Sequence, residues 1–244
     1  MFCPVCNHKE YSKLLTVKDF TVSSENFEVV ECTSCGFRYT AHPPAPDQIG
    51  RYYQSDAYIS HTDSKKGLFN TIYQLIRKQA VASKRKLVTH YSRRKTGQLL
   101  DYGCGTGAFL VEMKSAGWQV QGMEPDPGAA SKAAELTASV ISNPDQLASL
   151  PENAFDVVTM WHVLEHVHDL HGTLDHVKRI LKQDGILIVA VPNHTSFDAR
   201  HYAADWAAYD VPRHLHHFSP DSLSKLALHE GQGHKTHVVR CFLC

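Results

Sequence analysis

From residue 96 onward, short apolar runs alternate with longer stretches of helical periodicity. The runs "GQLLD", "WQVQGME", "SVIS", "FDVVTMW" and "ILIVAVPN" have the length of buried β-strands. Between them lie stretches such as "AFLVEMKSAG", "PGAASKAAELT" and "LHGTLDHVKRILKQDG", and in the last one Leu170, Leu174, Val177 and Leu181 mark one helix face. This alternation predicts an α/β fold with a doubly wound, mostly parallel sheet.

The first 95 residues have a different pattern. Residues 1–41 contain two extended runs, "YSKLLTV" and "NFEVVECTSCGFRYT", which predict a small β unit. The three prolines of "AHPPAPDQIG" indicate a linker near residues 41–50, and residues 67–92 have the apolar spacing of an amphipathic helix, whole or broken. We therefore expect a β unit at 1–41, a linker with a helical segment at 42–95, and the α/β domain at 96–244.

Composition limits the classes of protein that remain. The chain has 244 residues with 43% hydrophobic content, enough for one sizeable α/β domain and a small appendage. Lys plus Arg equals Asp plus Glu at 25 each, so no overall field attracts nucleic acid or an anionic membrane. No apolar run approaches the roughly 20 residues that span a bilayer, and the chain begins "MFCPVC" rather than with a basic and apolar leader. These features predict a cytoplasmic location.

One segment departs from this charge balance. Residues 77–95 contain eight basic residues and no acidic one, which could bind phosphates or make weak peripheral contact with anionic lipid. The alternative is a solvated helix face that covers the following domain, and we favour it.

The cysteines near the start form two C-x-x-C pairs, Cys3 with Cys6 and Cys32 with Cys35. Two such pairs supply four thiolates in a tetrahedron, which predicts a zinc ribbon with a structural zinc ion. About forty residues cannot otherwise bury a stable core. A redox pair is the alternative. Cys241 and Cys244 have the same spacing but no second pair, so we expect them to be buried strand residues.

A glycine-rich loop, "LLDYGCGTGAFL", lies between the first strand and the first helix of the α/β domain. Gly103, Gly105 and Gly107 let the backbone approach a ligand closely. Asp101 ends the preceding strand at the binding crevice, where a carboxylate would repel a pyrophosphate but attract an ammonium and a sulfonium group. This favours S-adenosylmethionine over a dinucleotide, with Glu124 at the end of the second strand binding two ribose hydroxyls.

Four segments together resemble the successive motifs of class I S-adenosylmethionine-dependent methyltransferases over about residues 96–230: "LLDYGCGTGAFL", "GMEPD", "LPENAFDVVTMWHVLEHVHD" and "LKQDGILIVAVPN". The segment "DVPRHLHHFSPDSLSKL" is similar to one in the subgroup that has an N-terminal zinc ribbon. The resemblance implies a Rossmann-like methyltransferase fold. It also implies an enzyme that uses S-adenosylmethionine.

The resemblance carries over to particular positions. Asp101 and the loop from Gly103 to Gly107 would hold the methionine part, with Cys104 as a small buried residue within that loop. Glu124, followed by Pro125, would bind the ribose. The segment 143–147, with Asp145 and Gln146, would border the adenine, although many relatives have an acidic and a small residue where this chain has "NPDQL".

The pentapeptide "HVLEH" follows the fourth strand and fits the H-x-x-E-H pattern of one class of zinc metallopeptidases. A peptidase needs this motif inside a helix and a third ligand from another segment, and neither is evident. We interpret Trp161 and His162 as part of the cofactor wall, and Glu165 and His166 as facing the acceptor. His162 or His166 could be the general base, oriented by Glu165. Equally, these histidines could cap or pack against the next helix.

Two further expectations concern the end of the chain. Residues 193–218 form an insertion that could fold over the acceptor and includes His214, His216 and His217, while Trp206 and Tyr209 either line it or pack beneath it. Only one strand is expected after the helix that starts near Ser219, whereas relatives complete the sheet with an antiparallel strand. The chain is therefore expected to be shortened at this end, with one sheet edge uncovered.

These features predict a methyltransferase acting on an oxygen or carbon nucleophile of a small molecule or glycan-linked intermediate. One alternative is methylation of ribosomal RNA, because certain rRNA guanine methyltransferases also have a zinc ribbon, but the zero net charge disfavours it. Another is a non-catalytic module that binds cofactor and a partner. The sequence predicts no oligomeric state.

Overall fold

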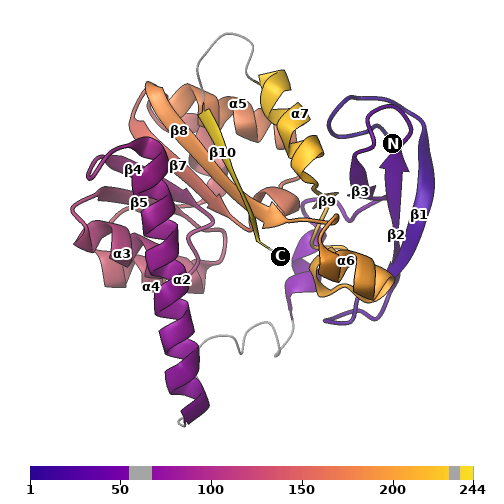
Figure 1. The fold of residues 1–244 in the computed structure, drawn as a ribbon, viewed down its shortest axis with the longest axis horizontal. Helices are drawn as coiled ribbons and strands as arrows, with labels where there is room; N and C mark the ends of the chain where they lie inside the picture. Colours follow the sequence, from indigo (N-terminus) through magenta and orange to yellow (C-terminus); the bar gives the residue numbers. More distant parts are fainter. Residues whose placement is uncertain (55–67, 231–236, 244) are drawn as a thin grey trace.

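The computed structural model describes residues 1–54, 68–230 and 237–243, with side chains for 1–54 and 76–226. The chain forms two β-sheets that lie side by side, one of six strands and one of four (Figure 1). Within the described residues, no helix has both the length and the apolar character required to cross a membrane.

The six-stranded sheet is parallel at every described pairing, in the order β10-β8-β7-β4-β5-β6. Its strands are β4 (Gln98–Tyr102), β5 (Gln119–Met123), β6 (Ile141–Ser142), β7 (Phe155–Trp161), β8 (Leu181–Pro192) and β10 (His237–Leu243). All seven residues of β7 are buried, as expected for a strand covered on both faces. The predicted doubly wound, Rossmann-like sheet is confirmed.

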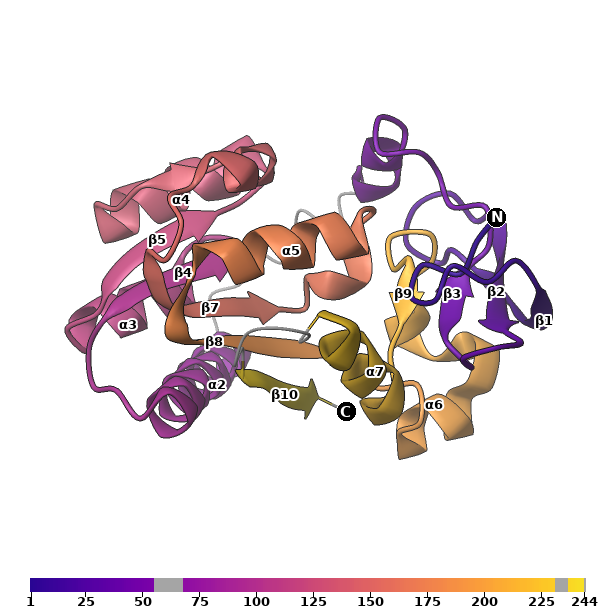
Figure 2. The same ribbon diagram turned by 90° about the horizontal axis from the view of Figure 1, so that it is seen from above.

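Helices cover both faces of this sheet (Figure 2). On one face lie α2 (Leu68–Ser92), α3 (Ala108–Ser115) and α4 (Pro127–Thr137); on the other lie α5 (Leu170–Ile180) and α7 (Pro220–Glu230). Successive strand residues point to opposite faces, so Leu99 packs with the first group and Leu100 with the second.

Helix α5 ends at Ile180, before the "LKQDG" stretch that the sequence pattern assigned to the helix, and β8 begins at Leu181 rather than at Ile186. Leu181, expected on the helix face, has extended backbone angles and begins β8, where it pairs with Phe155 of β7. Its side chain is buried in the strand, and burial is also what the helical periodicity predicts, so the periodicity could not locate the boundary.

Strand β10 pairs in parallel with β8 along its whole length and forms the edge of the sheet. This is the one strand expected after the last helix, and within the described residues the edge without a partner strand on this side is that of β10. The side chain of Cys241 and the whole of Cys244 lie outside the described residues, so the expectation that they are buried strand cysteines stays a prediction.

The four-stranded sheet contains β1 (Tyr11–Lys18), β2 (Asn26–Cys32), β3 (Arg38–Thr40) and β9 (His216–His217). Strands β1 and β2 form the expected hairpin, and β3 follows the second cysteine pair and pairs with β2. The fourth comes from the insertion after β8, and it pairs antiparallel with β3 through His216 and His217. The N-terminal unit, called the ribbon sheet below, thus incorporates a strand from a distant part of the chain.

Side chains join the ribbon sheet to the α/β part through a common core. Phe37 packs edge-on against Phe218 with ring centroids 5.5 Å apart, and both belong to the same buried cluster as Leu100 of β4. This explains how so short a β unit is stabilised: it buries its apolar residues against the rest of the protein.

The insertion after β8 packs against the ribbon sheet. It consists of α6 (Phe197–Tyr202), η4 (Ala203–Asp205), η5 (Ala207–Tyr209) and β9. Trp206 and Tyr209 are 7% and 2% exposed and share a cluster with Val17 and Val29 of the ribbon sheet. Of the two expectations for these aromatic residues, packing within the core is the one observed.

Helix α2 is continuous from Leu68 to Ser92. Its basic side chains contact the α/β part: Arg85 pairs with Glu112 of α3 at 2.7 Å, and Nζ of Lys84 lies 4.8 Å from the ring centroid of Trp161. Just after the helix, Nη1 of Arg94 lies 3.4 Å from Oδ1 of Asp156. These pairings support a helix that covers the neighbouring domain over one that binds phosphate or lipid.

Candidate functional site

The carboxyl ends of β4 and β5 bring two acidic residues together. Asp101 in β4 pairs with Gly122 of β5, and Glu124 follows two residues later. Because parallel strands end at the same edge of a sheet, this edge is where open α/β sheets bind ligands. Asp101 is 2% exposed, and its Oδ1 accepts a hydrogen bond from Oγ1 of Thr159 at 2.6 Å.

Burial changes the ionisation of Asp101. Desolvation disfavours its charged form and raises its pKa to about 7, while the Thr159 hydroxyl and the charge of Lys84 oppose the rise and Glu124 adds to it. The side chain is therefore only about half ionised near neutral pH in the absence of a ligand. Binding of a cationic ligand would favour the ionised form of Asp101 and release this proton. The preference for a cation that was inferred from the sequence therefore depends on pH.

Glu124 connects β5 to the glycine loop. Its Oε2 accepts a hydrogen bond of 2.8 Å from the N–H of Gly105, and its Oε1 accepts one of 3.1 Å from the N–H of Asp126. Burial raises its pKa. Each carboxylate oxygen retains a lone pair for a further donor such as a ribose hydroxyl.

The glycines of the loop have distinct roles. Gly105 and Gly107 both have left-handed φ angles, of 53° and 81°, which favour glycine. A Cβ at Gly107 would lie 2.9 Å from the Cβ of Ala133 on α4, so this glycine permits helix packing. A Cβ at Gly105 would meet nothing within 4 Å, so this is the position where a ligand can approach the backbone.

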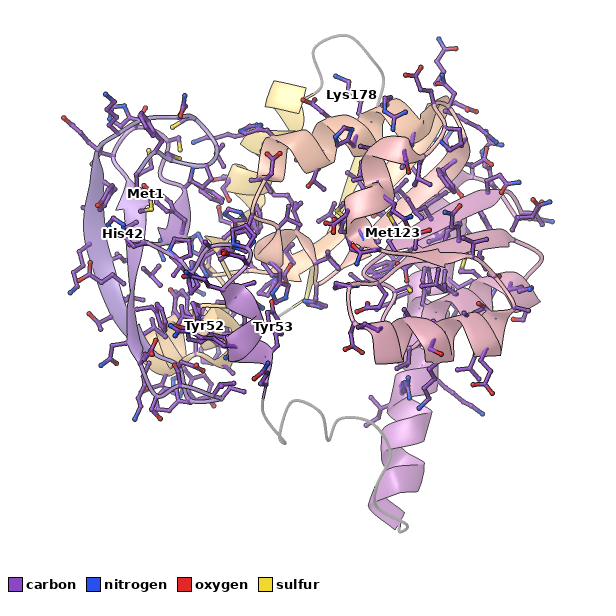
Figure 3. All side chains as sticks on the ribbon, turned by 180° about the vertical axis from the view of Figure 1, so that it is seen from behind. Met1, His42, Tyr52, Tyr53, Met123 and Lys178 are labelled. Carbon is purple, nitrogen blue, oxygen red and sulfur yellow. The ribbon has the colours of Figure 1, made fainter. Side chains whose placement is uncertain are left out.

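Gly103 and Cys104 anchor the start of the loop. Both backbone N–H groups donate to the carbonyl of Met123 at the end of β5. Met123 is labelled in Figure 3. The Sγ of Cys104 would lie 2.7 Å from a Cβ at Gly122, so this side chain points into the sheet rather than toward the open edge. Burial raises the pKa of the Cys104 thiol to about 12, which agrees with a packing role.

The remaining candidates for cofactor binding are scattered around this edge. Pro125, Asp145 and Gln146 are exposed. Asp145 and Gln146 lie in the first turn of η2 (Pro144–Ser149), where the Gln146 side chain accepts a hydrogen bond from the N–H of Asn143. Trp161 is 7% exposed and packs against Phe109 of α3, so most of its ring lies in the core behind the loop.

The "HVLEH" segment is not α-helical. His162 follows the end of β7 with a left-handed φ of 60°, and η3 (Leu164–His166) is a single turn of 3-10 helix. Val163, between them, fills the space beside Gly103, which places this segment directly against the glycine loop. His162 and His166 therefore do not share one face of an α-helix, as the metallopeptidase pattern requires.

Within this segment, His162 and Glu165 form a pair. The His162 side chain is 42% exposed, whereas that of Glu165 is 0% exposed, and Nδ1 of His162 lies 3.4 Å from Oε1 of Glu165. The positive φ of His162 is a form of local backbone strain in a residue other than glycine. Such strain often occurs at functional positions, and His162 lies beside the edge of the sheet where ligands bind.

His166 contacts residues that the sequence did not single out. Its Nδ1 lies 3.1 Å from the hydroxyl of Tyr53 on η1 (Ile49–Tyr53) and 3.0 Å from the carbonyl of Arg213. Figure 3 shows Tyr52 and Tyr53 on this short segment between the ribbon sheet and the α/β part. Arg213 belongs to the segment "DVPRHLHHFSPDSLSKL" but was given no role there, and Tyr53 lies in no motif, so only the tertiary structure brings them to His166.

The four N-terminal cysteines converge. Sγ of Cys3 lies 3.6 Å from Sγ of Cys35, and Sγ of Cys6 lies 3.6 Å from that of Cys32. One sulfur from each residue lies within 4.8 Å of all the others. Zinc–sulfur bonds of about 2.3 Å imply sulfur–sulfur edges of about 3.8 Å, so these two distances are compatible with a zinc tetrahedron.

The two cysteine turns also have the same backbone hydrogen bonds. The N–H of Cys3 donates to the carbonyl of His8, and that of Cys32 donates to the carbonyl of Phe37. In each turn the residue after the second cysteine, Asn7 or Gly36, has a left-handed φ and donates back to the first cysteine. Asn and Gly are the residues that adopt this conformation most readily.

Comparison with known proteins identifies relatives of the α/β part. A family model described as a methyltransferase domain matches residues 73–231. The ubiquinone biosynthesis O-methyltransferase of Maricaulis maris is 32% identical over 151 residues, 55% of this chain and 58% of that protein. The protein of the same name from Bradyrhizobium sp. (strain ORS 278) is 29% identical over 147 residues, 54% of this chain and 56% of that protein. The chain thus spans little more than half the length of these curated relatives.

Solved structures resemble the same region. A SAM-dependent methyltransferase from Thermotoga maritima, described as a possible histamine N-methyltransferase, matches with 25% identity and a TM-score of 0.50, covering 66% of this chain and 78% of that one. Magnesium protoporphyrin IX methyltransferase from Synechocystis PCC 6803, with bound SAH, matches with 16% identity and a TM-score of 0.55, covering 75% and 88%. The second likeness concerns the fold alone.

Proposed function

Because the chain belongs to the methyltransferase-domain family through its match over residues 73–231, we propose that it transfers the methyl group of S-adenosylmethionine to an oxygen nucleophile of a small molecule. The names of the curated relatives support oxygen as the acceptor atom. A carbon nucleophile or a glycan-linked acceptor would need similar positioning, and the labelled product distinguishes them.

The choice of S-adenosylmethionine as cofactor rests on one observation. Two carboxyl groups at the ends of neighbouring strands border the glycine loop. Glu124 lies close enough to Asp101 to raise the pKa of its carboxyl group, and Glu124 accepts a hydrogen bond from the N–H of Gly105. Negative charge at the edge favours a sulfonium and an ammonium over a pyrophosphate. The open space at Gly105 leaves room for the ligand.

S-adenosylmethionine supplies an activated methyl group on a sulfonium, and the protein must hold the acceptor in line with it. The acceptor oxygen forms the new bond to carbon as the carbon–sulfur bond breaks, and the hydroxyl proton passes to a base. His162 is suited to accept this proton because its ring is partly exposed and its Nδ1 faces Glu165. His166 is less suited, since burial lowers its pKa to about 4 and its Nδ1 is already engaged.

For the ribbon sheet we propose a structural zinc ion held by Cys3, Cys6, Cys32 and Cys35. The sulfur distances and the matched backbone turns support this assignment. Four thiolates leave no open position for substrate, so this ion would stabilise the fold rather than take part in the reaction.

Incubation of the full chain with methyl-labelled S-adenosylmethionine and fractionated extract tests the function. We expect label in a small-molecule fraction, and we expect Glu124→Gln, which keeps the shape but not the charge, to lower labelling markedly. Labelled RNA would instead support the ribosomal alternative, and cofactor binding with no labelled product would support a non-catalytic module. Calorimetric binding of NAD without binding of S-adenosylmethionine would contradict the proposal.

A further inference from the structure

The carboxyl group of Glu165 is fully buried, and no hydrogen-bond donor among the described residues reaches it. Its side chain is 0% exposed, and within the described residues neither Oε1 nor Oε2 accepts a hydrogen bond. The Nδ1 of His162 lies 3.4 Å from Oε1 and so approaches only one of the two oxygens. A buried carboxylate in this situation is costly unless a cation compensates it.

Two histidines lie beside this carboxyl group, and the protein fixes the orientation of both rings. Nδ1 of His166 lies 3.0 Å from the carbonyl of Arg213, and Nδ1 of His214 lies 2.8 Å from the carbonyl of Ala208. A carbonyl only accepts, so each Nδ1 carries the proton in the neutral ring and each Nε2 carries a lone pair. This is the arrangement in which a backbone carbonyl orients a metal-binding imidazole.

The three residues come from two chain segments that are bonded together. The N–H of Leu215 donates to the carbonyl of Glu165 at 2.8 Å, which holds the residue after His214 against η3. The rings of His166 and His214 meet edge to face with centroids 4.5 Å apart. One ligand atom from each of Glu165, His166 and His214 lies within 4.8 Å of the other two. His214 is thus a third candidate ligand from another segment.

We infer that Glu165, His166 and His214 form a binding site for a divalent transition-metal ion, with Zn²⁺ as the expected occupant. Two imidazoles and one carboxylate are a ligand set of zinc sites that keep a fourth position open. Metal–ligand distances of about 2.0–2.2 Å require ligand atoms roughly 3.4 Å apart, so binding would draw the three side chains together by small rotations. This ion would be separate from the ribbon zinc, and its binding does not depend on the proposed reaction.

A metal ion would also complete the hydrogen-bonding and charge requirements of this cluster. An imidazole whose Nδ1 donates to a backbone carbonyl presents the lone pair of its Nε2, but it supplies no positive charge to the Glu165 carboxylate. A metal ion would supply that charge and use both lone pairs at once.

Cobalt substitution of the purified full chain tests this inference, because Co²⁺ reports its ligands by absorption. We expect two cobalt ions per chain after dialysis: one with the thiolate charge-transfer band of the four cysteines, and one with only the visible bands of nitrogen and oxygen ligands. Glu165→Gln and His214→Gln are expected to lose the second ion and its bands while keeping the thiolate band.

The thiolate band also shows that each variant remains folded around the ribbon. His201→Gln is the matched control, since His201 is an exposed histidine on α6, and it should retain two ions. A single ion per wild-type chain would overturn the inference, as would a second ion that persists in both Glu165→Gln and His214→Gln. Loss of the second ion in His201→Gln would also count against it, because surface histidines would then be responsible. Neither readout uses the methyl transfer, so failure here leaves the proposed function to its own test.

Discussion

Arg213 donates a hydrogen bond of 3.0 Å from Nη2 to Oδ1 of Asp19, which lies 194 residues earlier in the chain. Both side chains are almost completely buried, at 1% and 0% exposed. Arg213 also bonds to Asp210 and to the carbonyl of Tyr52, so one guanidinium joins the ribbon sheet, the η1 segment and the insertion after β8. The ribbon sheet and the α/β part are therefore connected by charge as well as by apolar packing.

Removing this connection should destabilise the whole protein. Arg213→Ala leaves Asp19 and Asp210 without their main donor, and the loss of one partner from a buried ion pair typically costs about 3–5 kcal/mol. Urea unfolding monitored by circular dichroism measures the change. Glu152→Ala is the control, because its contact with Arg179 is 4.0 Å long and largely exposed, so its cost should stay under about 1 kcal/mol. Equal effects of the two substitutions would show that the Arg213 network contributes little.

Binding of S-adenosylmethionine should depend on pH through Asp101. A cationic ligand prefers the ionised carboxyl group, so affinity should fall by about tenfold for each pH unit below the pKa of about 7 and level off above it. Calorimetry in buffers of different ionisation enthalpy should show proton release on binding. Asp101→Asn should bind weakly and without this pH dependence, and a pH-dependent Asp101→Asn variant would place the titrating group elsewhere.

The raised pKa of Asp101 should affect the stability of the ligand-free protein in the opposite direction, so that stability falls as pH rises. Because the pKa of Asp101 is raised from 3.8 in the unfolded chain to about 7 in the native state, the native state binds the proton more tightly between these values. Its contribution to the free energy of unfolding therefore falls as pH rises from 3.8 to about 7. Asp101→Asn should remove that part of the decline in a thermal or urea titration.

His162 should affect catalysis more than cofactor binding. A general base contributes typically about 10²–10⁴-fold to the rate, so His162→Asn should lower kcat by a factor in that range with little change in affinity for S-adenosylmethionine. Asn is chosen because it tolerates the left-handed φ of 60° at this position. His201→Gln should retain full activity. An unchanged kcat in His162→Asn would assign the base to another residue or show that no base is needed.

Removal of the ribbon zinc should destabilise the α/β part as well as the ribbon sheet. Phe37 and Phe218 share one buried cluster with the six-stranded sheet, and β9 pairs directly with β3. Chelation should therefore lower the midpoint of a single cooperative thermal transition, measured by scanning calorimetry, and added Zn²⁺ should restore it. Two separate transitions in the zinc-loaded protein would contradict this coupling.

Local features of the chain were sufficient to locate much of the candidate site. The strand before the glycine loop places Asp101 at the sheet edge, and Glu124 follows the next strand, because the ends of parallel strands meet there whatever surrounds them. The C-x-x-C pairs likewise identified the four converging cysteines, since a tight turn brings each pair together locally. Trp161 was expected in the cofactor wall because it ends the fourth strand, but the sequence could not give the direction of its ring, which is 7% exposed and packs against Phe109.

The sequence by itself determined the alternating strands and helices, the glycine loop with its two carboxyl groups, and the cysteine pairs, because each depends on residues close together in the chain. Only the tertiary structure decided that β9 joins the ribbon sheet, that Arg213 bonds to Asp19, and that His214 lies beside Glu165 and His166. These contacts join segments separated by many residues, and they form because burying a shared core offsets the entropy of bringing those segments together. No local periodicity records such a pairing.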